Sequence, residues 1–339
     1  MVNFWQNLKK QKALKRGSEK GEPILVLAPM ADVTDAAFRR IIAKYGKPDA
    51  MWTEFVSADG LIRANEKGKR KLMRDLLYSK KERPIVAQLF SANPEYMYKA
   101  AQLVAELGFD GLDINMGCPD RGIEKQGAGA ALIKDPKQAR RVLNAAMRGV
   151  ADANKIIPVS VKTRIGYNKN ELETWLPELL AEKPALITVH ARTRKEMSDV
   201  PARWEHVKRA VEIRDAFQSE TLIFGNGDVA GIEDAKNKAR ETGADGVMLG
   251  RAIFGNPWLF SKNKKPISVK QKLLVMVEHA KLFEKLLGDI KNFSVMKKHF
   301  KAYVAGFDGA GELRAELMQT ESVKEVEKIV KNFLKSKKP

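Results

Sequence analysis

The chain has one cysteine in 339 residues, and it lies in the segment DINMGCP at residues 113–119. An apolar run ends at Asn115 and the chain then turns through Gly117. The turn presents the Cys118 thiol, and Pro119 stiffens it. α/β enzymes place reactive groups where a strand passes into a loop. Free cysteines are often small buried hydrophobes, so this segment alone leaves a catalytic and a structural role equally open.

Further polar side chains fall at the ends of other apolar runs. Lys162 could stabilise negative charge on a bound ring, or it could simply extend to water. His190 could hold a phosphate or a ring edge, and Gln88 could hydrogen-bond a ring, but both could equally serve the protein's own packing. The other residues at these run ends are Pro29, Met30 and Ala31, Asn115 and Cys118, Asn226, Gly227 and Asp228, and Gly250 with Arg251.

The two glycine-containing segments at 225–228 and 250–251 are typical of an anion-binding site. The segment GNGD at 225–228 has glycines that let backbone N–H groups approach a phosphate, and the segment GR at 250–251 adds a guanidinium. Loops after the seventh and eighth strands are a common phosphate site in barrel enzymes. Two ordinary glycine turns are the alternative. Arg192 and Arg194, together with Lys162 and Arg164, add positive potential nearby.

The elements that must position these residues alternate along the chain. Eight short β-type runs are separated by stretches long enough for one helix each, which predicts an α/β fold, a (β/α)8 TIM barrel. An open doubly wound sheet is the alternative, but no G-x-G-x-x-G follows the first run. The runs span residues 24–28, 50–55, 85–90, 111–115, 158–162, 186–190, 221–226 and 246–250.

The two ends of the chain differ from this pattern. We expect a basic N-terminal arm at 1–23, or a short amphipathic helix using Phe4, Trp5 and Leu8. The barrel is expected at 24–262. After a polar linker, apolar residues at helical spacing and the absence of β-type runs predict an all-helical domain at 266–339.

The composition indicates the kind of partner. The formal charge is +19 with a pI near 9.8, and the excess is spread over the whole chain, which favours a long polyanion over a small acidic metabolite. A merely lysine-rich surface is the alternative. One cysteine excludes an internal disulfide, so we expect a reducing, cytoplasmic location. The scattered histidines predict no metal site, and no apolar run has the length of a membrane span.

Seven motifs, in order, resemble the tRNA-dihydrouridine synthase family and are most similar to its bacterial B-type enzymes. The resemblance is close over roughly 24–260 and looser in the helical tail. APMxxVTDxxFR together with NMGCP is its most specific part. The motifs are APMADVTDAAFR, AQLF, DINMGCP, VKTRIG, TVHARTR, FGNGDV and GRAIFGNPW.

The resemblance implies an FMN-bound barrel, a helical domain that grips tRNA, and NADPH as reductant. The enzyme would reduce the C5–C6 bond of selected uridines, with hydride passing from FMN to C6 and a proton from Cys118 to C5. An unperturbed cysteine is protonated at neutral pH, as a general acid must be. Asn115 would position the base, and Arg164 and Arg192 would bind the substrate. The cofactor residues would be Pro29, Met30, Ala31, Gln88, Lys162, His190, Asn226, Gly227, Asp228, Gly250 and Arg251.

Three segments depart from the family pattern on the substrate side, so the sequence predicts flavin binding but not which uridine is reduced. They are Asp32, Asp120 to Gly122, and 196–204. We expect a monomer without metal or membrane attachment. The two other functions considered are a different FMN barrel oxidoreductase, such as a dihydroorotate or dihydropyrimidine dehydrogenase, and a non-catalytic RNA-binding protein. The intact Cys118, Lys162 and phosphate loops argue against the second.

Overall fold

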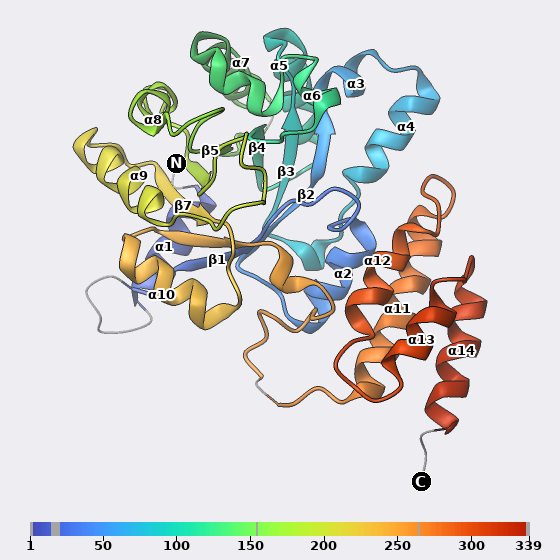
Figure 1. The fold of residues 1–339 in the computed structure, drawn as a ribbon. Coiled ribbons are helices and arrows are strands. Elements are labelled where there is room, and N and C mark those ends of the chain that lie inside the picture. Colours follow the sequence, from blue (N-terminus) through green and yellow to red (C-terminus); the bar gives the residue numbers. More distant parts are fainter. Residues whose placement is uncertain (1–2, 15–20, 154, 264, 337–339) are drawn as a thin grey trace.

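The computed structural model describes residues 3–14, 21–153, 155–263 and 265–336, and its centre is a closed barrel (Figure 1). Eight parallel strands pair in chain order, and β8 closes against β1. The predicted (β/α)8 barrel is therefore confirmed, and closure rules out the open sheet. The strands are β1 Ile24–Leu27, β2 Ala50–Ser57, β3 Ile85–Phe90, β4 Gly111–Met116, β5 Val159–Arg164, β6 Leu186–His190, β7 Leu222–Asn226 and β8 Gly246–Leu249.

Helices surround the barrel and begin at recognisable caps. Asp35, for example, caps α2 by accepting a hydrogen bond from the backbone N–H of Phe38, and Asn93 caps α5 with a proline in its first turn. The helices of this layer are α2 Ala36–Tyr45, α3 Ala58–Arg63, α4 Glu66–Asp75, α5 Pro94–Glu106, α6 Arg121–Glu124, α7 Pro136–Ala151, α8 Leu172–Leu180, α9 Glu205–Ala216 and α10 Ile232–Thr242, with 3₁₀ turns η1 Lys80–Glu82, η2 Gly129–Lys134 and η3 Arg251–Ile253.

The N-terminal helix α1, Phe4–Leu14, packs against the amino ends of the strands, where a Cβ at Gly111 would lie 3.2 Å from the Phe4 ring. Trp5 is only 1% exposed and stacks on Trp52 at 5.5 Å. Both belong to the apolar cluster that fills the barrel interior near the amino ends of the strands. Ion pairs from Lys9 to Asp245 and from Lys12 to Asp49 join the helix to residues that precede β8 and β2. The short helix expected around Phe4 and Trp5 is therefore present, and it forms part of the barrel's core.

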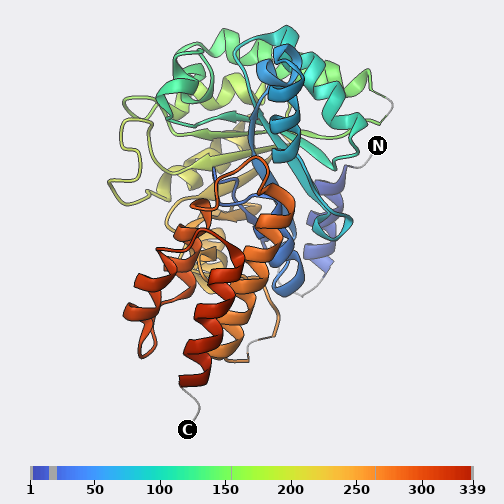
Figure 2. The same ribbon diagram turned by 90° about the vertical axis from the view of Figure 1, so that its right-hand side faces the viewer.

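A helical region follows the barrel and packs against its α2 side (Figures 1 and 2). Phe38 of α2 stacks on His279 of α11 at 4.9 Å, and Glu278 binds both Lys44 and Tyr45. This matches the predicted all-helical C-terminal region. Its helices are α11 Val269–Leu287, α12 Val295–Tyr303, α13 Ala310–Leu317 and α14 Val323–Ser336.

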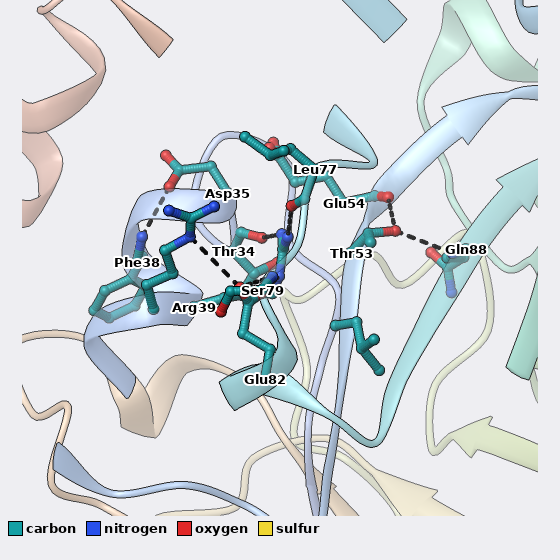
Figure 3. A network of polar contacts seen from close by, with 12 residues as sticks. Thr34, Asp35, Phe38, Arg39, Thr53, Glu54, Leu77, Ser79, Glu82 and Gln88 are labelled. Atoms are coloured by element: carbon teal, nitrogen blue, oxygen red, sulfur yellow. Dashed lines mark hydrogen bonds and ion pairs between the residues drawn. The ribbon is translucent and has the colours of Figure 1, made fainter. Parts of the chain in front are cut away.

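A buried arginine organises the loop after β1 (Figure 3). Arg39 is fully buried and donates to Glu82 at 2.9 Å and to the carbonyls of Thr34 and Leu77 at 2.6 Å each. Breaking such a buried pair would leave an uncompensated charge. Since Thr34 also accepts the backbone N–H of Met30 at 2.9 Å, this network holds the loop that begins at the first strand's carboxyl end.

Candidate active site at the carboxyl rim of the barrel

The strand register brings the predicted site residues together. Side chains alternate along a strand, so Gln88 shares the inner face of the barrel with Val86, which belongs to the interior cluster. Gln88 pairs with Asp113 across β3 and β4, and Asn115 pairs with Lys162 across β4 and β5. The polar groups at these strand ends therefore form one connected rim.

A hydrogen-bonded relay begins at Asp113, which is fully buried. Its carboxylate accepts from Gln88 Nε2 at 2.6 Å and from Ser160 Oγ at 2.5 Å. Burial raises the pKa of Asp113 to about 6, against the lowering effect of these donors. Because a carboxylate only accepts, it makes Gln88 present its amide nitrogen to Asp113 and its amide oxygen to the next residue.

That next residue is Asn115, which links the relay to the cysteine. Asn115 Nδ2 donates to Gln88 Oε1 at 3.1 Å, and Asn115 Oδ1 accepts the backbone N–H groups of Gly117 at 3.1 Å and Cys118 at 2.8 Å. The amide thus shapes the turn that presents the thiol. The role of Asn115 toward a base stays a prediction.

Cys118 is half-buried beside a small apolar cluster formed by Phe90, Ile123 and Ala128. Burial raises the pKa of the thiol above its usual value, and nearby cations do not reverse this shift. The thiol therefore carries its proton at neutral pH, which suits a proton donor and does not suit a thiolate nucleophile.

Lys162 contributes a half-buried cation to the same rim. Burial, followed by repulsion from Arg164, lowers the pKa of Lys162 to about 8. Within the described part of the chain, no residue forms a hydrogen bond or an ion pair with its ammonium group. A cation that is partly removed from water and has no acceptor is costly unless a ligand supplies one, so Lys162 can receive an anionic ring edge.

The structure places the other two predicted substrate-binding residues within the protein's own contacts. Arg164 donates to the carbonyl oxygens of Gly117, Thr193 and Met197, which joins the loops after β4 and β6. β5 continues to Arg164, two residues beyond the predicted run, and pairs there with β6. Arg192 is 2% exposed and binds the carbonyl of Val200 at 2.6 Å. Their contact with substrate stays a prediction.

The loops after β7 and β8 form an Arg–Asp cradle. Asp228 binds both Arg192 and Arg251, and it also accepts the backbone N–H of Ala202 at 2.8 Å. Burial opposes ionisation, but these donors lower the pKa of Asp228 below its ordinary value. Gly227 lies in the left-handed region at φ 121°, where glycine is favoured.

The remaining predicted cofactor residues lie around this cradle. His190 accepts from Arg192 Nη1 at 3.2 Å, because an arginine can only donate. Burial and the surrounding cations hold the pKa of His190 well below its usual range, so its ring is neutral. Asn226 donates to the carbonyl of Met248 at 2.8 Å. The loop after β1 lies close to the last strand, since a Cβ at Gly250 would be 3.6 Å from Met30 Sδ.

Two residues important to this geometry were missed by sequence reasoning. Asp113 was part of the DINMGCP motif, and a charged residue inside an otherwise apolar run was the available signal. Trp204 donates from its indole nitrogen to the carbonyl of Gly227 at 2.8 Å, and a Cβ at Gly225 would come within 2.3 Å of its ring. The GNGD turn therefore depends on an aromatic side chain from the preceding loop.

The departures from the family pattern have local structural partners. Asp120 caps the short helix α6 by accepting the backbone N–H groups of Gly122 and Ile123 at 2.9 and 3.1 Å. In the segment 196–204, Arg203 pairs with Glu196 at 2.7 Å, and Glu196 accepts the backbone N–H of Thr193. Both departures thus build the rim loops themselves.

Neither a membrane-spanning helix nor a metal-binding cluster is found among the described residues. Over residues 3–14, 21–153, 155–263 and 265–336, no helix is long and apolar enough to cross a membrane. In the same ranges no group of three or more His, Cys, Asp or Glu side chains is arranged to hold a metal ion.

The carboxyl rim of this barrel gathers a protonated thiol, an Arg–Asp cradle and a lysine without a partner among the residues that the structure describes. These features define a (β/α)8-barrel enzyme. The family model described as dihydrouridine synthase matches residues 26–338, and the chain belongs to this family. A Staphylococcus aureus protein named "Probable tRNA-dihydrouridine synthase" is 36% identical over 333 residues, covering 98% of this chain and 95% of that protein. A Bacillus subtilis protein named "Probable tRNA-dihydrouridine synthase 2" is 37% identical, covering 98% and 96%.

Solved structures share the fold at low identity. Histamine dehydrogenase from Rhizobium has a TM-score of 0.52 and 13% identity, covering 76% of this chain and 49% of that chain. The 6-hydroxypseudooxynicotine amine oxidase of Pseudomonas geniculata has a TM-score of 0.54 and 12% identity, covering 83% and 56%. At such identities these structures support the barrel and nothing finer.

Proposed function

We propose that this protein is a flavin-dependent tRNA-dihydrouridine synthase, which reduces the C5–C6 bond of specific uridines in tRNA with NADPH as electron donor. The observation that carries the proposal is the Cys118 thiol, which burial keeps protonated and Asn115 presents near the Lys162 cation. Membership of the dihydrouridine synthase family supports it.

The residues of the rim fit FMN. Lys162 lacks an acceptor among the described residues, and an isoalloxazine edge would supply one. The guanidinium of Arg251 is the largely exposed member of the cradle, so a phosphate could bind it there. Gln88 and His190 would face the ring or phosphate. The other residues assigned to FMN are Pro29, Met30, Ala31, Asn226, Gly227, Asp228 and Gly250.

The chemistry divides between the cofactor and the chain. When bound, a flavin supplies the hydride that the reduction of a uracil double bond needs. Cys118 supplies the proton at C5, since its raised pKa keeps the thiol protonated at neutral pH. Asn115 fixes the backbone of the thiol turn, and Lys162 would balance negative charge near the ring.

The basic surface would serve the RNA. A uridine must leave its stack to reach a barrel mouth, and phosphate contacts over a folded RNA would offset that cost. The net charge of +19 suits such a partner. We assign tRNA binding to the helical region at 266–339, and we expect a cytoplasmic monomer.

The proposal is tested on the purified full-length protein. A yellow protein with FMN absorbance should form dihydrouridine in tRNA when NADPH is added, as measured by mass spectrometry. Mapping dihydrouridine in tRNA from cells with and without the gene should show loss at defined positions. Comparable turnover of free uracil or orotate would instead indicate a free-pyrimidine oxidoreductase, and tight tRNA binding without any flavin would indicate a non-catalytic protein.

A further inference from the structure

Lys291 belongs to the helical region but its ammonium group lies among carboxylates of the barrel. It follows α11, and its side chain is only 11% exposed. Its Nζ atom is 2.8 Å from Glu54 Oε2, 3.2 Å from Asp75 Oδ1 and 3.5 Å from Asp32 Oδ1. These acidic groups come from β2, the end of α4 and the loop after β1, so one lysine joins three separate segments to the helical region.

Glu54 passes this contact on to the loop after β1. Its other oxygen, Oε1, accepts the backbone N–H of Asp32 at 2.5 Å. Asp32 lies in the left-handed region at φ 53°, which aspartate tolerates better than most residues. It directly follows Pro29, Met30 and Ala31, so the carboxylate of Glu54 holds the end of that tripeptide.

The local electrostatics make the lysine necessary. Burial raises the pKa of Glu54 to about 7, and the charges of Asp35 and Asp75 add to that effect. Burial opposes the charge of Lys291, but Glu54 and Asp75 keep its pKa above the ordinary value. Without the ammonium group, the buried carboxyl groups of Glu54 and Asp75 would lose their counter-ion. They would then repel one another or take up protons, and the Asp32 N–H would lose its ionised acceptor.

Two other contacts also attach the helical region to the barrel, so attachment alone does not require Lys291. Lys44 of α2 binds Glu278 of α11 at 2.7 Å, and both side chains are more exposed than that of Lys291. Arg74 of α4 binds the carbonyl of Leu286 at 2.9 Å. These contacts join the helical region to the barrel without touching residues 29–32.

We propose that Lys291 is a positioning residue through which the helical region holds the flavin-facing loop at Pro29 to Asp32, so that docking of this region and flavin affinity are coupled. The ligand rests on the proposed function; the coupling rests on the contacts of Lys291 with Glu54 and of Glu54 with the Asp32 amide. Asp32, one of the departures from the family pattern, is then a third partner for the same lysine.

The test is FMN affinity, measured by quenching of flavin fluorescence when FMN is added to flavin-free full-length protein. Lys291→Met should weaken FMN binding about tenfold, within the range of coupling between linked sites. Lys281→Met is the matched control, because Lys281 pairs with Glu327 inside the helical region. It should keep parental affinity. If Lys291→Met does not fold, Lys291→Gln keeps a donor for Glu54 without the charge and should show the same loss.

A compensating change separates this coupling from general destabilisation. Adding Glu54→Gln to Lys291→Met removes the uncompensated charge while leaving a carbonyl to accept the Asp32 N–H, so FMN affinity should return toward the parental value. Lys291→Arg, which keeps the positive charge, should retain the parental FMN affinity. A lower melting temperature with unchanged FMN affinity in Lys291→Met would overturn the coupling alone. A parent protein that binds no FMN would overturn the proposed function and the coupling together.

Discussion

The side-chain oxygen of Asn115 accepts the backbone N–H of the catalytic candidate Cys118 at 2.8 Å. The nitrogen of the same amide donates to Gln88 Oε1 at 3.1 Å. One asparagine therefore fixes the direction of the thiol turn and connects it to the barrel interior. The rate of proton transfer depends steeply on the position of the donor. Loss of this contact should therefore lower kcat.

Replacing this asparagine tests the positioning. Asn115→Ala should lower kcat about 10²-fold, because the amides of Gly117 and Cys118 lose their acceptor and the thiol shifts. Single-turnover reduction of tRNA is the measurement, with FMN content checked by absorbance. Asn144→Ala, which removes a surface amide bonded to Glu182, is the control. Parental kcat in Asn115→Ala would contradict the positioning role.

Asp113 sets the direction of the whole relay. In Asp113→Asn the new amide can turn its NH₂ group toward Gln88, which removes the reason for Gln88 to offer its oxygen to Asn115. We expect kcat to fall about tenfold, which is typical when a residue that supports a functional side chain is removed. FMN should stay bound. Steady-state kinetics with tRNA and the flavin absorbance spectrum measure the two effects. Unchanged kcat would show that the relay does not reach the thiol.

The same substitution should change stability with pH in a defined direction. The folded-state pKa of Asp113, about 6, lies above its ordinary value of 3.8. Its contribution to stability is therefore fully present below about pH 4 and is lost as pH rises through 6. The melting temperature of the parent, relative to Asp113→Asn, should fall over this interval. A difference that stays constant from pH 4 to 7 would mean that Asp113 ionises normally.

The state of the thiol can be measured directly because Cys118 is the only cysteine. The pH dependence of its alkylation by iodoacetamide should have a midpoint above about 8.5, the ordinary thiol value, since burial disfavours the thiolate. Cys118→Ala should keep FMN and lose about 10²–10⁴-fold in turnover, the usual value of a positioned acid. A midpoint below 7, or parental turnover in the alanine variant, would refute the acid assignment.

The Arg–Asp cradle predicts selectivity for the phosphate of the cofactor. Arg251→Gln should weaken FMN binding about tenfold and leave riboflavin binding nearly unchanged, because only FMN carries a group for a charge-assisted contact. Fluorescence titrations with the two flavins give the ratio. Arg240→Gln, an exposed change on α10, controls for net charge. An equal loss for both flavins would place the phosphate elsewhere.

The N-terminal helix should stabilise the barrel. Trp5 is 1% exposed between Trp52 and Phe224, so Trp5→Ala leaves a cavity and should cost about 3–5 kcal/mol of the free energy of unfolding. Urea denaturation followed by circular dichroism measures it. Phe217→Ala, at a residue 47% exposed, should cost far less. Equal effects of the two changes would show that α1 does not contribute to the core.

Much of the fold and part of the site could be predicted from local pattern. Eight β-type runs with helical spacing predict a barrel, because strand and helix periodicities are properties of short segments. The turn at Cys118 and the glycine loops at 225–228 and 250–251 were visible for the same reason. Since parallel strands share one carboxyl edge, their order along the chain was enough to predict that these groups lie on one rim.

The amino-acid sequence by itself therefore determined the barrel, the lone thiol at a strand end and the basic charge. Only the tertiary structure decided that Asp113 directs the relay, that Trp5 fills the barrel floor, and that Lys291 reaches Glu54 from the helical region. These relations join segments far apart in the chain and depend on burial, which sets both the pKa of a group and the cost of leaving it unpaired. No local pattern contains that information, because burial exists only once the segments have packed together.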